Sequence, residues 1–251
     1  MPNICINDVV LNTDALVLDK DGTLIDFHLI WSTRIETAAK AIVAHRQDST
    51  QLLGHLYRCV GYDPARRQTL GQGPLATAPI HKLEIIVTGA LYQWGIPWED
   101  ASQLATRHFT RLMSELPAAN EIKPRGEILT TLQELHRGGI RLAVATTDNR
   151  AATEVCLEAI GIQNLINTLV CGDDENLPVK PDPAVLLVLA EQFGIPVKRL
   201  AMVGDTTSDL CMAKKAGAGY AIGIVGGAGE ESELRAETKF LINSLEEIRV
   251  I

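Results

Sequence analysis

Short runs of apolar residues recur along the chain and predict strands that are buried on both faces. The first is Ala-Leu-Val-Leu at residues 15–18, which ends abruptly in a charged segment. Five further runs have the same character, at residues 141–145, 168–170, 200–203, 220–224 and 240–242. Continuous apolar runs of this length are typical of parallel strands, because helices cover such a sheet on both sides.

Amphipathic helical patterns lie between these runs. Apolar residues at helical spacing occupy residues 128–135, 150–160 and 185–193, and glycine follows each stretch, where a helix commonly ends. Strand and helix therefore alternate from residue 126 to the end. This alternation predicts an α/β fold in which helices lie on both faces of a parallel sheet.

Residues 27–118 break the alternation. This region contains helical stripes and no strand-like run, and Gly and Pro residues separate the stripes. A run of helices after the first strand predicts an inserted, all-helical domain at 27–118, with the α/β core formed by residues 1–26 and 119–251. Residues 116–126, which include two prolines and a glycine, are the expected return linker.

Composition narrows the classes of function. Hydrophobic residues make up 46% and charged residues 22%, as in ordinary globular proteins, and the formal net charge is −8. We expect no nucleic-acid or membrane partner, because an acidic chain repels both and no apolar run is long enough to span a bilayer. No signal peptide is visible. The five cysteines are scattered, which favours reduced thiols and a cytoplasmic location.

Polar side chains follow three of the predicted strands, and a lysine precedes one of the helices. The residues concerned are Asp19 and Asp21, Thr146 and Thr147, Asp205 and Asp209, and Lys180. Ligands of open parallel sheets bind at the carboxyl ends of the strands, so we expect these side chains to converge there. Crowded carboxylates need a neutralising cation, and oxygen ligands without His or Cys point to Mg²⁺.

The motifs in this order resemble those of the haloacid dehalogenase-like superfamily, many members of which are Mg²⁺-dependent phosphatases. The resemblance rests on D-K-D-G-T-L at 19–24, Thr146, K-P-D-P at 180–183 and G-D-T-T-S-D at 204–209. It implies a Rossmann-like core with a helical cap, as in phosphoglycolate phosphatase and β-phosphoglucomutase. The implied activity is hydrolysis of a small phosphorylated metabolite, with phosphoglycolate as a reasonable analogy.

The resemblance also implies roles for the acids and the lysine. Asp19 is the nucleophile that forms an aspartyl-phosphate, and Asp21 protonates the leaving group and then deprotonates the attacking water. Lys180 balances charge beside Asp19. Mg²⁺ is held by Asp19, Asp205, the main-chain carbonyl of Asp21, and Asp209 either directly or through water.

The implied phosphate-binding groups are hydrogen-bond donors. Thr146, together with backbone N–H groups near Asp21 and Thr147, donates to the phosphoryl oxygens, and Gly22 allows the chain to turn sharply after the strand. The family often has Asn at the position of Thr147, so this chain departs from the family's pattern at one phosphate contact. The glycines of residues 226–229 lack the sequel of a phosphate loop and are interpreted as a flexible edge loop.

Substrate contacts from the insertion are the least defined. His28, Trp31 and Arg34 come straight after the first connection and are the residues to test first, although most polar residues there belong to the solvated faces of helices. A dehalogenase is disfavoured because it lacks an acid at the position of Asp21. A β-phosphoglucomutase-like mutase remains open, as does a non-catalytic binding module of the same fold. The oligomeric state and the physiological substrate also remain open.

Overall fold

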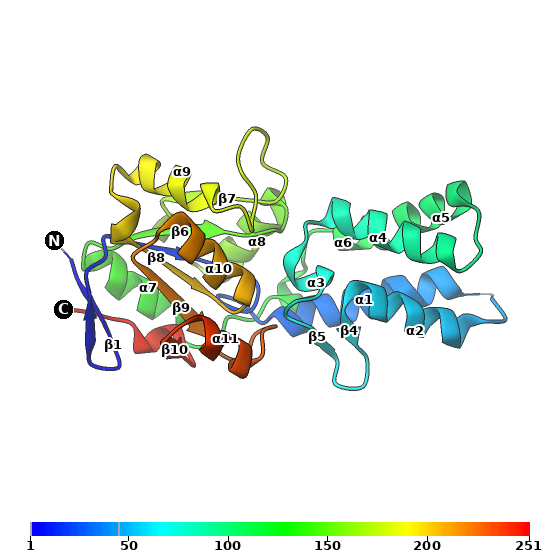
Figure 1. Cartoon of the computed structure of the whole chain (residues 1–251), viewed down its shortest axis with the longest axis horizontal. Helices are drawn as coiled ribbons and strands as arrows, with labels where there is room; N and C mark the ends of the chain where they lie inside the picture. The colour runs from blue at the N-terminus through cyan, green and yellow to red at the C-terminus, as the bar shows by residue number, and fades with distance from the viewer. Residues whose placement is uncertain (1, 45) are drawn as a thin grey trace.

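The computed structural model describes residues 2–44 and 46–251. The molecule is elongated, with a helix-covered sheet at one end and a helical insertion at the other (Figure 1). Both chain termini lie at the sheet end, away from the insertion.

The sheet consists of six parallel strands in the order β10-β9-β8-β3-β6-β7. Their bounds are β3 (Ala15–Leu18), β6 (Arg141–Ala145), β7 (Thr168–Val170), β8 (Leu200–Gly204), β9 (Tyr220–Ile224) and β10 (Phe240–Ile242). The six predicted strands are confirmed, with β8 longer by Gly204. The chain order reverses at β3, which lies between β8 and β6, so this is the switch point where open sheets bind ligands.

The two faces of the sheet bury alternate residues of each strand. In β3, Leu16 and Leu18 pack in a cluster with α7 (Ile128–Arg137) and α8 (Arg150–Ala159). Val17 packs on the other face with α9 (Ala184–Phe193) and α10 (Thr207–Ala216). The prediction of a parallel sheet covered by helices on both faces is therefore confirmed.

The insertion lies between β3 and β6 and is mainly helical. Its helices are α1 (Phe27–Val43), α2 (Ser49–Val60), α3 (Pro74–Thr77), α4 (Ile80–Gln93), α5 (Trp98–Leu104), the π-helical segment η1 (Ala105–Thr110) and α6 (Arg111–Met113). Asp26 is the N-cap of helix α1, because its Oδ1 accepts hydrogen bonds from the backbone N–H groups of His28 and Leu29.

The expectation that the insertion is all-helical is wrong at one place. Strands β4 (Tyr62–Asp63) and β5 (Gln68–Thr69) pair as an antiparallel hairpin. Two-residue strands are too short to give an alternating pattern, so hydrophobic periodicity could not indicate them.

A small antiparallel sheet joins the two ends of the chain. Strand β1 (Ile4–Ile6) lies between β2 (Val9–Leu11) and β11 (Arg249–Val250). The remaining elements are α11 (Glu231–Glu237) and the 3-10 helices η2 (Ala119–Glu121), η3 (Gln163–Leu165), η4 (Val197–Arg199) and η5 (Leu245–Glu247). None of the helices in the described part of the chain combines the length and the apolar character that crossing a bilayer requires.

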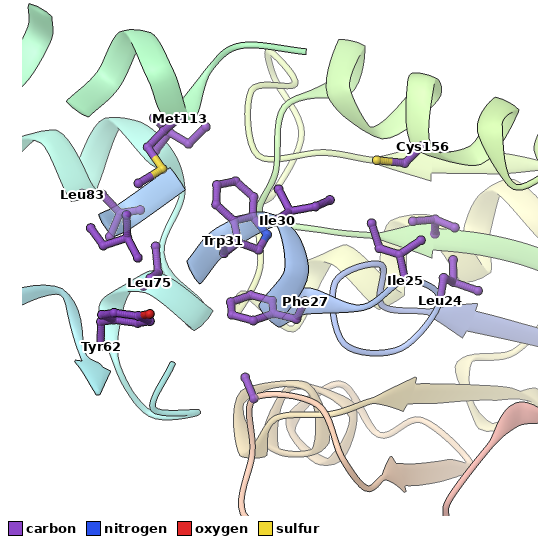
Figure 2. Packing of buried hydrophobic residues seen from close by; sticks show 14 of the residues in the cluster. Leu24, Ile25, Phe27, Ile30, Trp31, Tyr62, Leu75, Leu83, Met113 and Cys156 are labelled. Carbon is purple, nitrogen blue, oxygen red and sulfur yellow. The ribbon is translucent and has the colours of Figure 1, made fainter. Parts of the chain in front are cut away.

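Two segments connect the insertion to the sheet, and they are hydrogen-bonded to each other. The N–H of Asp26 donates to the carbonyl of Lys123 at 2.8 Å, the N–H of Arg125 donates to the carbonyl of Leu24 at 3.0 Å, and Ile25 forms a β-bridge with Pro124. We call residues 24–26 and 123–125 together the linker ribbon. Figure 2 shows the apolar side chains that continue from this ribbon into α1.

Candidate active site

The carboxyl edge of the sheet brings the predicted polar residues together. Asp19 follows β3, and its N–H continues the ladder by donating to the carbonyl of Val203 on β8 at 2.9 Å. Thr146 follows β6, the neighbour of β3 on the other side. One narrow cavity of about 30 Å³ lies between the sheet and the insertion. It is lined by all the acids, threonines and the lysine that we predicted for the core, namely Asp19, Asp21, Thr146, Thr147, Lys180, Asp205 and Asp209. Gly22 does not line it.

Lys180 joins two of the carboxylates. Its Nζ lies 2.6 Å from Oδ1 of Asp19 and 2.6 Å from Oδ1 of Asp209, and it donates to the carbonyl of Ala145 at 3.2 Å. Burial alone would lower the pKa of Lys180, but the two carboxylates raise it above the ordinary lysine value. The ammonium is therefore held charged beside the predicted nucleophile.

Asp19 combines burial with one free oxygen. Burial raises the pKa of its carboxyl to about 7, against the opposing effect of Lys180. Its Oδ1 is bound to Lys180, whereas its buried Oδ2 has no hydrogen-bond partner. A buried oxygen without a partner is costly in a stable fold, and it is the oxygen that a ligand in the cavity would meet.

Asp205 is enclosed by glycines. Its Oδ2 accepts a hydrogen bond from the N–H of Ala228 at 2.6 Å, and a Cβ on Gly22 or Gly227 would collide with its carboxylate. Gly22 also has φ +91°, which disfavours any other residue. Burial raises the pKa of Asp205 well above its ordinary value, and Asp19 and Asp209 raise it further.

The glycine loop at residues 226–229 lies against the candidate site. We predicted a flexible edge loop, but the loop packs against Asp205, and a Cβ on Gly71 of the insertion would collide with the backbone of Gly229. The glycines permit this close approach of backbone to side chain and of backbone to backbone.

Asp209 has two partners. Its Oδ2 accepts from the side chain of Thr206 at 2.7 Å and from the N–H of Thr206 at 3.2 Å, which forms the capping box of α10. Its Oδ1 contacts Lys180. The start of α10 thus fixes this carboxylate, which in turn holds the lysine.

A second buried lysine was missed by the sequence analysis. Lys20, between the two aspartates of the first motif, places its Nζ 2.6 Å from Oδ2 of Asp21 and 2.9 Å from Oδ2 of Asp148. Burial raises the pKa of Asp21, and Lys20 opposes that rise. The available signal was a lysine two residues after a fully buried strand, where a charged side chain needs an opposite charge inside the protein.

Thr146 presents a hydroxyl to the cavity. Its Oγ1 accepts a hydrogen bond from the N–H of Asp148 at 3.1 Å, which leaves the hydroxyl hydrogen free to donate. Thr147 also lines the cavity. The carbonyl of Thr147 lies against Gly172, where a Cβ would collide with it.

The insertion supplies the opposite wall of the cavity, and that wall is mainly apolar. Phe27 and Trp31 stand at the start of α1, and Leu75 and Leu83 face them from α3 and α4 (Figure 2). The indole N–H of Trp31 is buried and has no hydrogen-bond partner. Trp31 is thus the one residue of the three singled out in the insertion that the structure brings to this cavity.

The other two lie elsewhere. The Nε2 of His28 is 3.3 Å from the carbonyl of Gly227, and His28 lines a separate cavity beside the glycine loop. Arg34 is buried inside the insertion, where it donates to the carbonyl of Glu115 at 2.7 Å and to the carboxylate of Glu121. Arg34 therefore ties helix ends together rather than facing a substrate.

The carboxylates have the chemistry of a site for a hard cation. Among the described residues no three His, Cys, Asp or Glu side chains are grouped closely enough to hold a metal ion as they stand. Lys180 contacts both Asp19 and Asp209. Burial, and then the neighbouring Asp19 and Asp209, raise the pKa of Asp205, so its ionised form needs a positive charge beyond that of Lys180. The buried Oδ2 of Asp19 also has no partner. An all-oxygen donor set fits Mg²⁺.

Comparison with known proteins gives matches over most of the chain. A sequence model of the haloacid dehalogenase-like hydrolases matches residues 13–217. A phosphoglycolate phosphatase of Agrobacterium fabrum is 30% identical over 204 residues, which cover 80% of this chain and 76% of that protein. A probable phosphatase, IndB, of Dickeya dadantii is 34% identical over 157 residues, or 61% of this chain and 67% of that protein.

The fold also has a counterpart among solved structures. The crystal structure of a predicted phosphoglycolate phosphatase from Haemophilus somnus superposes with a TM-score of 0.66 and 18% identity, covering 94% of this chain and 96% of that one. At that identity the match concerns the fold.

Proposed function

The chain belongs to the haloacid dehalogenase-like hydrolases and is a phosphatase, and we propose that it hydrolyses a small organic phosphate monoester through an aspartyl-phosphate at Asp19. One observation carries this proposal. Asp19 offers a buried, unpartnered oxygen to the cavity while Lys180 holds its other oxygen.

In the first half-reaction Oδ2 of Asp19 attacks phosphorus, and the bond between phosphorus and the alcohol oxygen breaks. Asp21 gives its proton to the departing alcohol. Burial supports this role, because it raises the pKa of Asp21 and so favours the protonated form. Lys180 stays paired with Asp19 and stabilises negative charge on the phosphoryl oxygens.

In the second half-reaction water attacks the aspartyl-phosphate. Asp21, now ionised, takes a proton from the water, and the bond between phosphorus and Asp19 breaks. Inorganic phosphate leaves, Asp19 returns as a carboxylate, and Asp21 is protonated again. Lys20 and Asp148 keep Asp21 in place through both halves. Thr146 and Thr147 are proposed to bind the phosphoryl oxygens from the β6 side of the cavity.

We propose Mg²⁺ as the cofactor. Asp19, Asp205 and the main-chain carbonyl of Asp21 would hold it, with Asp209 bound directly or through water. When bound, it would supply positive charge to the phosphoryl oxygens during transfer. The crowding of carboxylates around Asp205 supports this assignment.

The domain boundaries and the location in the cell belong to the same proposal. Residues 27–118 would form the cap that closes over the catalytic core of residues 1–26 and 119–251. A cytoplasmic location stays a prediction, supported by five free cysteines. The name of the A. fabrum relative makes phosphoglycolate one candidate substrate.

The deciding experiment traps the covalent intermediate. Purified protein is mixed with p-nitrophenyl phosphate and Mg²⁺, quenched in acid and digested, and the peptides are searched by mass spectrometry for phosphate on Asp19. We expect phosphate release that EDTA abolishes, and a phosphorylated Asp19 peptide that is missing from Asp19→Asn. Turnover that is independent of metal or intact in Asp19→Asn would contradict the proposal.

The same assay distinguishes the alternative activities. A sugar phosphomutase would convert glucose 1-phosphate to glucose 6-phosphate and release little inorganic phosphate. A non-catalytic binding module would neither isomerise glucose 1-phosphate nor release inorganic phosphate.

A further inference from the structure

The cavity has two chemically different walls. The wall from the sheet carries every ionisable group that lines it, namely Asp19, Asp21, Asp148, Lys180, Asp205 and Asp209. The wall from the insertion consists of Phe27, Trp31, Leu75, Ala76, Thr77, Ala78, Ile80 and Leu83. Among the described residues, the insertion places no charged side chain on the cavity.

The two walls receive different parts of a substrate. In the proposed reaction the phosphoryl group must lie against Asp19 and Lys180, on the sheet side. The alcohol points away from Asp19, because attack and departure are in line. The leaving group therefore meets the insertion wall, where Phe27 and Trp31 hold their rings 6.3 Å apart between centroids.

An anionic leaving group would have no partner on that wall. Arg34 and Lys82 are the Arg and Lys residues nearest in sequence to Trp31 and Leu83 of this wall, and neither lines the cavity. Arg34 is bound to Glu121 and to main-chain carbonyls, and Lys82 is exposed. The sheet wall would repel it, because its acidic side chains outnumber the ammonium groups of Lys180 and, behind the wall, Lys20. A carboxylate buried without a partner is strongly unfavourable.

A leaving group rich in hydroxyls would also be poorly satisfied. The polar side chains of the insertion wall are Trp31 and Thr77. The hydroxyl of Thr77 already donates to the carbonyl of Gly73 at 3.0 Å, and the indole N–H of Trp31 has no partner within hydrogen-bond distance but lies close enough to Asp21 to lower the pKa of that carboxyl. The wall thus offers at most one hydrogen bond, from an indole N–H that faces Asp21, and otherwise a surface of aromatic and aliphatic carbon.

From these observations, and resting on the proposed phosphatase activity, we infer that the preferred substrate is a phosphate monoester of a small, uncharged alcohol whose carbons next to the ester oxygen are apolar. Phosphoglycolate, whose carboxylate is bonded directly to the carbon that bears the ester oxygen, is a poor fit to this wall. The side chains that set this preference are Leu75 and Leu83 together with Phe27 and Trp31.

Three esters of matched shape test the inference. Phosphoglycolate, the phosphate ester of glycolamide and 2-methylpropyl phosphate share the same branched skeleton but carry an anionic, a neutral polar and an apolar group. We expect kcat/KM to rise in that order, with about 100-fold or more between the first and the last. A kcat/KM for phosphoglycolate equal to or above that of the two neutral esters would overturn the inference.

A variant of the wall tests the cause. Leu75→Lys places a cation on the insertion wall, and Leu75→Met is its control of similar length. We expect the ratio of kcat/KM for phosphoglycolate to that for 2-methylpropyl phosphate to rise about 10-fold or more in Leu75→Lys and to stay unchanged in Leu75→Met. An unchanged ratio in a folded Leu75→Lys would overturn the assignment of specificity to this wall. If Leu75→Lys does not fold, the comparison of the three esters on the unaltered protein decides.

The proposed function has its own readout in the same series. If p-nitrophenyl phosphate and all three esters resist hydrolysis in the presence of Mg²⁺, the phosphatase mechanism fails and this inference fails with it. If p-nitrophenyl phosphate is hydrolysed and phosphoglycolate is the best substrate among the other three esters, this inference fails but the phosphatase mechanism stands.

Discussion

Lys20 holds the carboxylate of Asp21, with its Nζ 2.6 Å from Oδ2, and the ammonium is buried together with its second partner, Asp148. A buried ammonium between two carboxylates is stable only as a complete set, because removing one partner leaves a charge without compensation. Asp21, the acid-base residue of the proposed reaction, is therefore positioned by the ammonium of Lys20, which does not itself line the cavity.

Replacing Lys20 by Met should destabilise the fold and displace Asp21. We expect the free energy of unfolding to fall by about 3–5 kcal/mol, since two buried carboxylates lose their counter-charge. Urea denaturation followed by circular dichroism measures this change. In the double variant Lys20→Met, Asp148→Asn one uncompensated charge is gone, so the loss should be smaller than the sum of the two single losses. Additive losses would show that the pair is not coupled.

Replacing Asp21 by Asn should separate the two half-reactions. For an alkyl phosphate, whose leaving group needs a proton, we expect kcat to fall by about 10²–10⁴-fold. The p-nitrophenolate group leaves without a proton, so the first half-reaction should survive while water attack slows. Stopped-flow measurement should then show a burst of p-nitrophenol close to one equivalent of enzyme. An unchanged steady-state rate for both esters would mean that another group moves the proton.

Replacing Asp205 by Asn should weaken the binding of Mg²⁺. The variant retains an oxygen that can accept from the N–H of Ala228 but loses a charge. We expect the Mg²⁺ concentration for half-maximal activity to rise about 10-fold or more, with the fold intact. Asp100→Asn, at an exposed position in α5, is the matched control and should behave like the unaltered protein. An equal Mg²⁺ requirement in the two variants would remove Asp205 from the metal site.

Replacing Arg34 by Met should lower stability rather than change substrate preference. The guanidinium is buried and binds the carbonyl of Glu115 and the carboxylate of Glu121, so we expect the unfolding free energy to fall by about 2–4 kcal/mol. The relative kcat/KM values of different esters should stay the same. A selective loss of activity on one ester would place Arg34 at the substrate after all.

The same ion pair gives stability a dependence on pH. Burial acts to raise the pKa of Glu121, but hydrogen bonds from Arg34 hold it below the ordinary value of 4.5. The folded-state pKa is thus below that of the unfolded chain, so the contribution of Glu121 is present above pH 4.5 and is lost as the pH falls through the folded-state pKa. Thermal unfolding between pH 6 and pH 3 should show a shallower acid loss for Arg34→Met than for the unaltered protein.

Hydrophobic patterning predicted the sheet well and the buried charges poorly. The run at 15–18 became β3 and the run at 220–224 became β9, because strands covered on both faces must be apolar throughout. Lys20 escaped prediction because its second partner, Asp148, is distant in sequence, and only the pairing of β3 with β6 brings the two together. The same holds for the contact between the glycine loop and Asp205.

The short strands and the side-chain directions in the insertion also needed the structure. The hairpin of β4 and β5 and the terminal pairing of β1 with β11 are too brief to give a period. Trp31 and Arg34 are three residues apart on α1, and sequence alone offered both as substrate contacts. In the structure Trp31 reaches the cavity, and Arg34 is bound to the residues that follow α6.

The linker ribbon limits how the insertion can move over the sheet. Two independent tethers would let one body tumble and twist relative to the other. Here the tethers share the hydrogen bonds between Asp26 and Lys123 and between Arg125 and Leu24. These bonds hold the two connecting segments side by side, so we expect the segments to move together rather than independently. If the insertion opens and closes as the proposed cap, the paired segments should bring Phe27 and Trp31 back to the same position over the edge of the sheet.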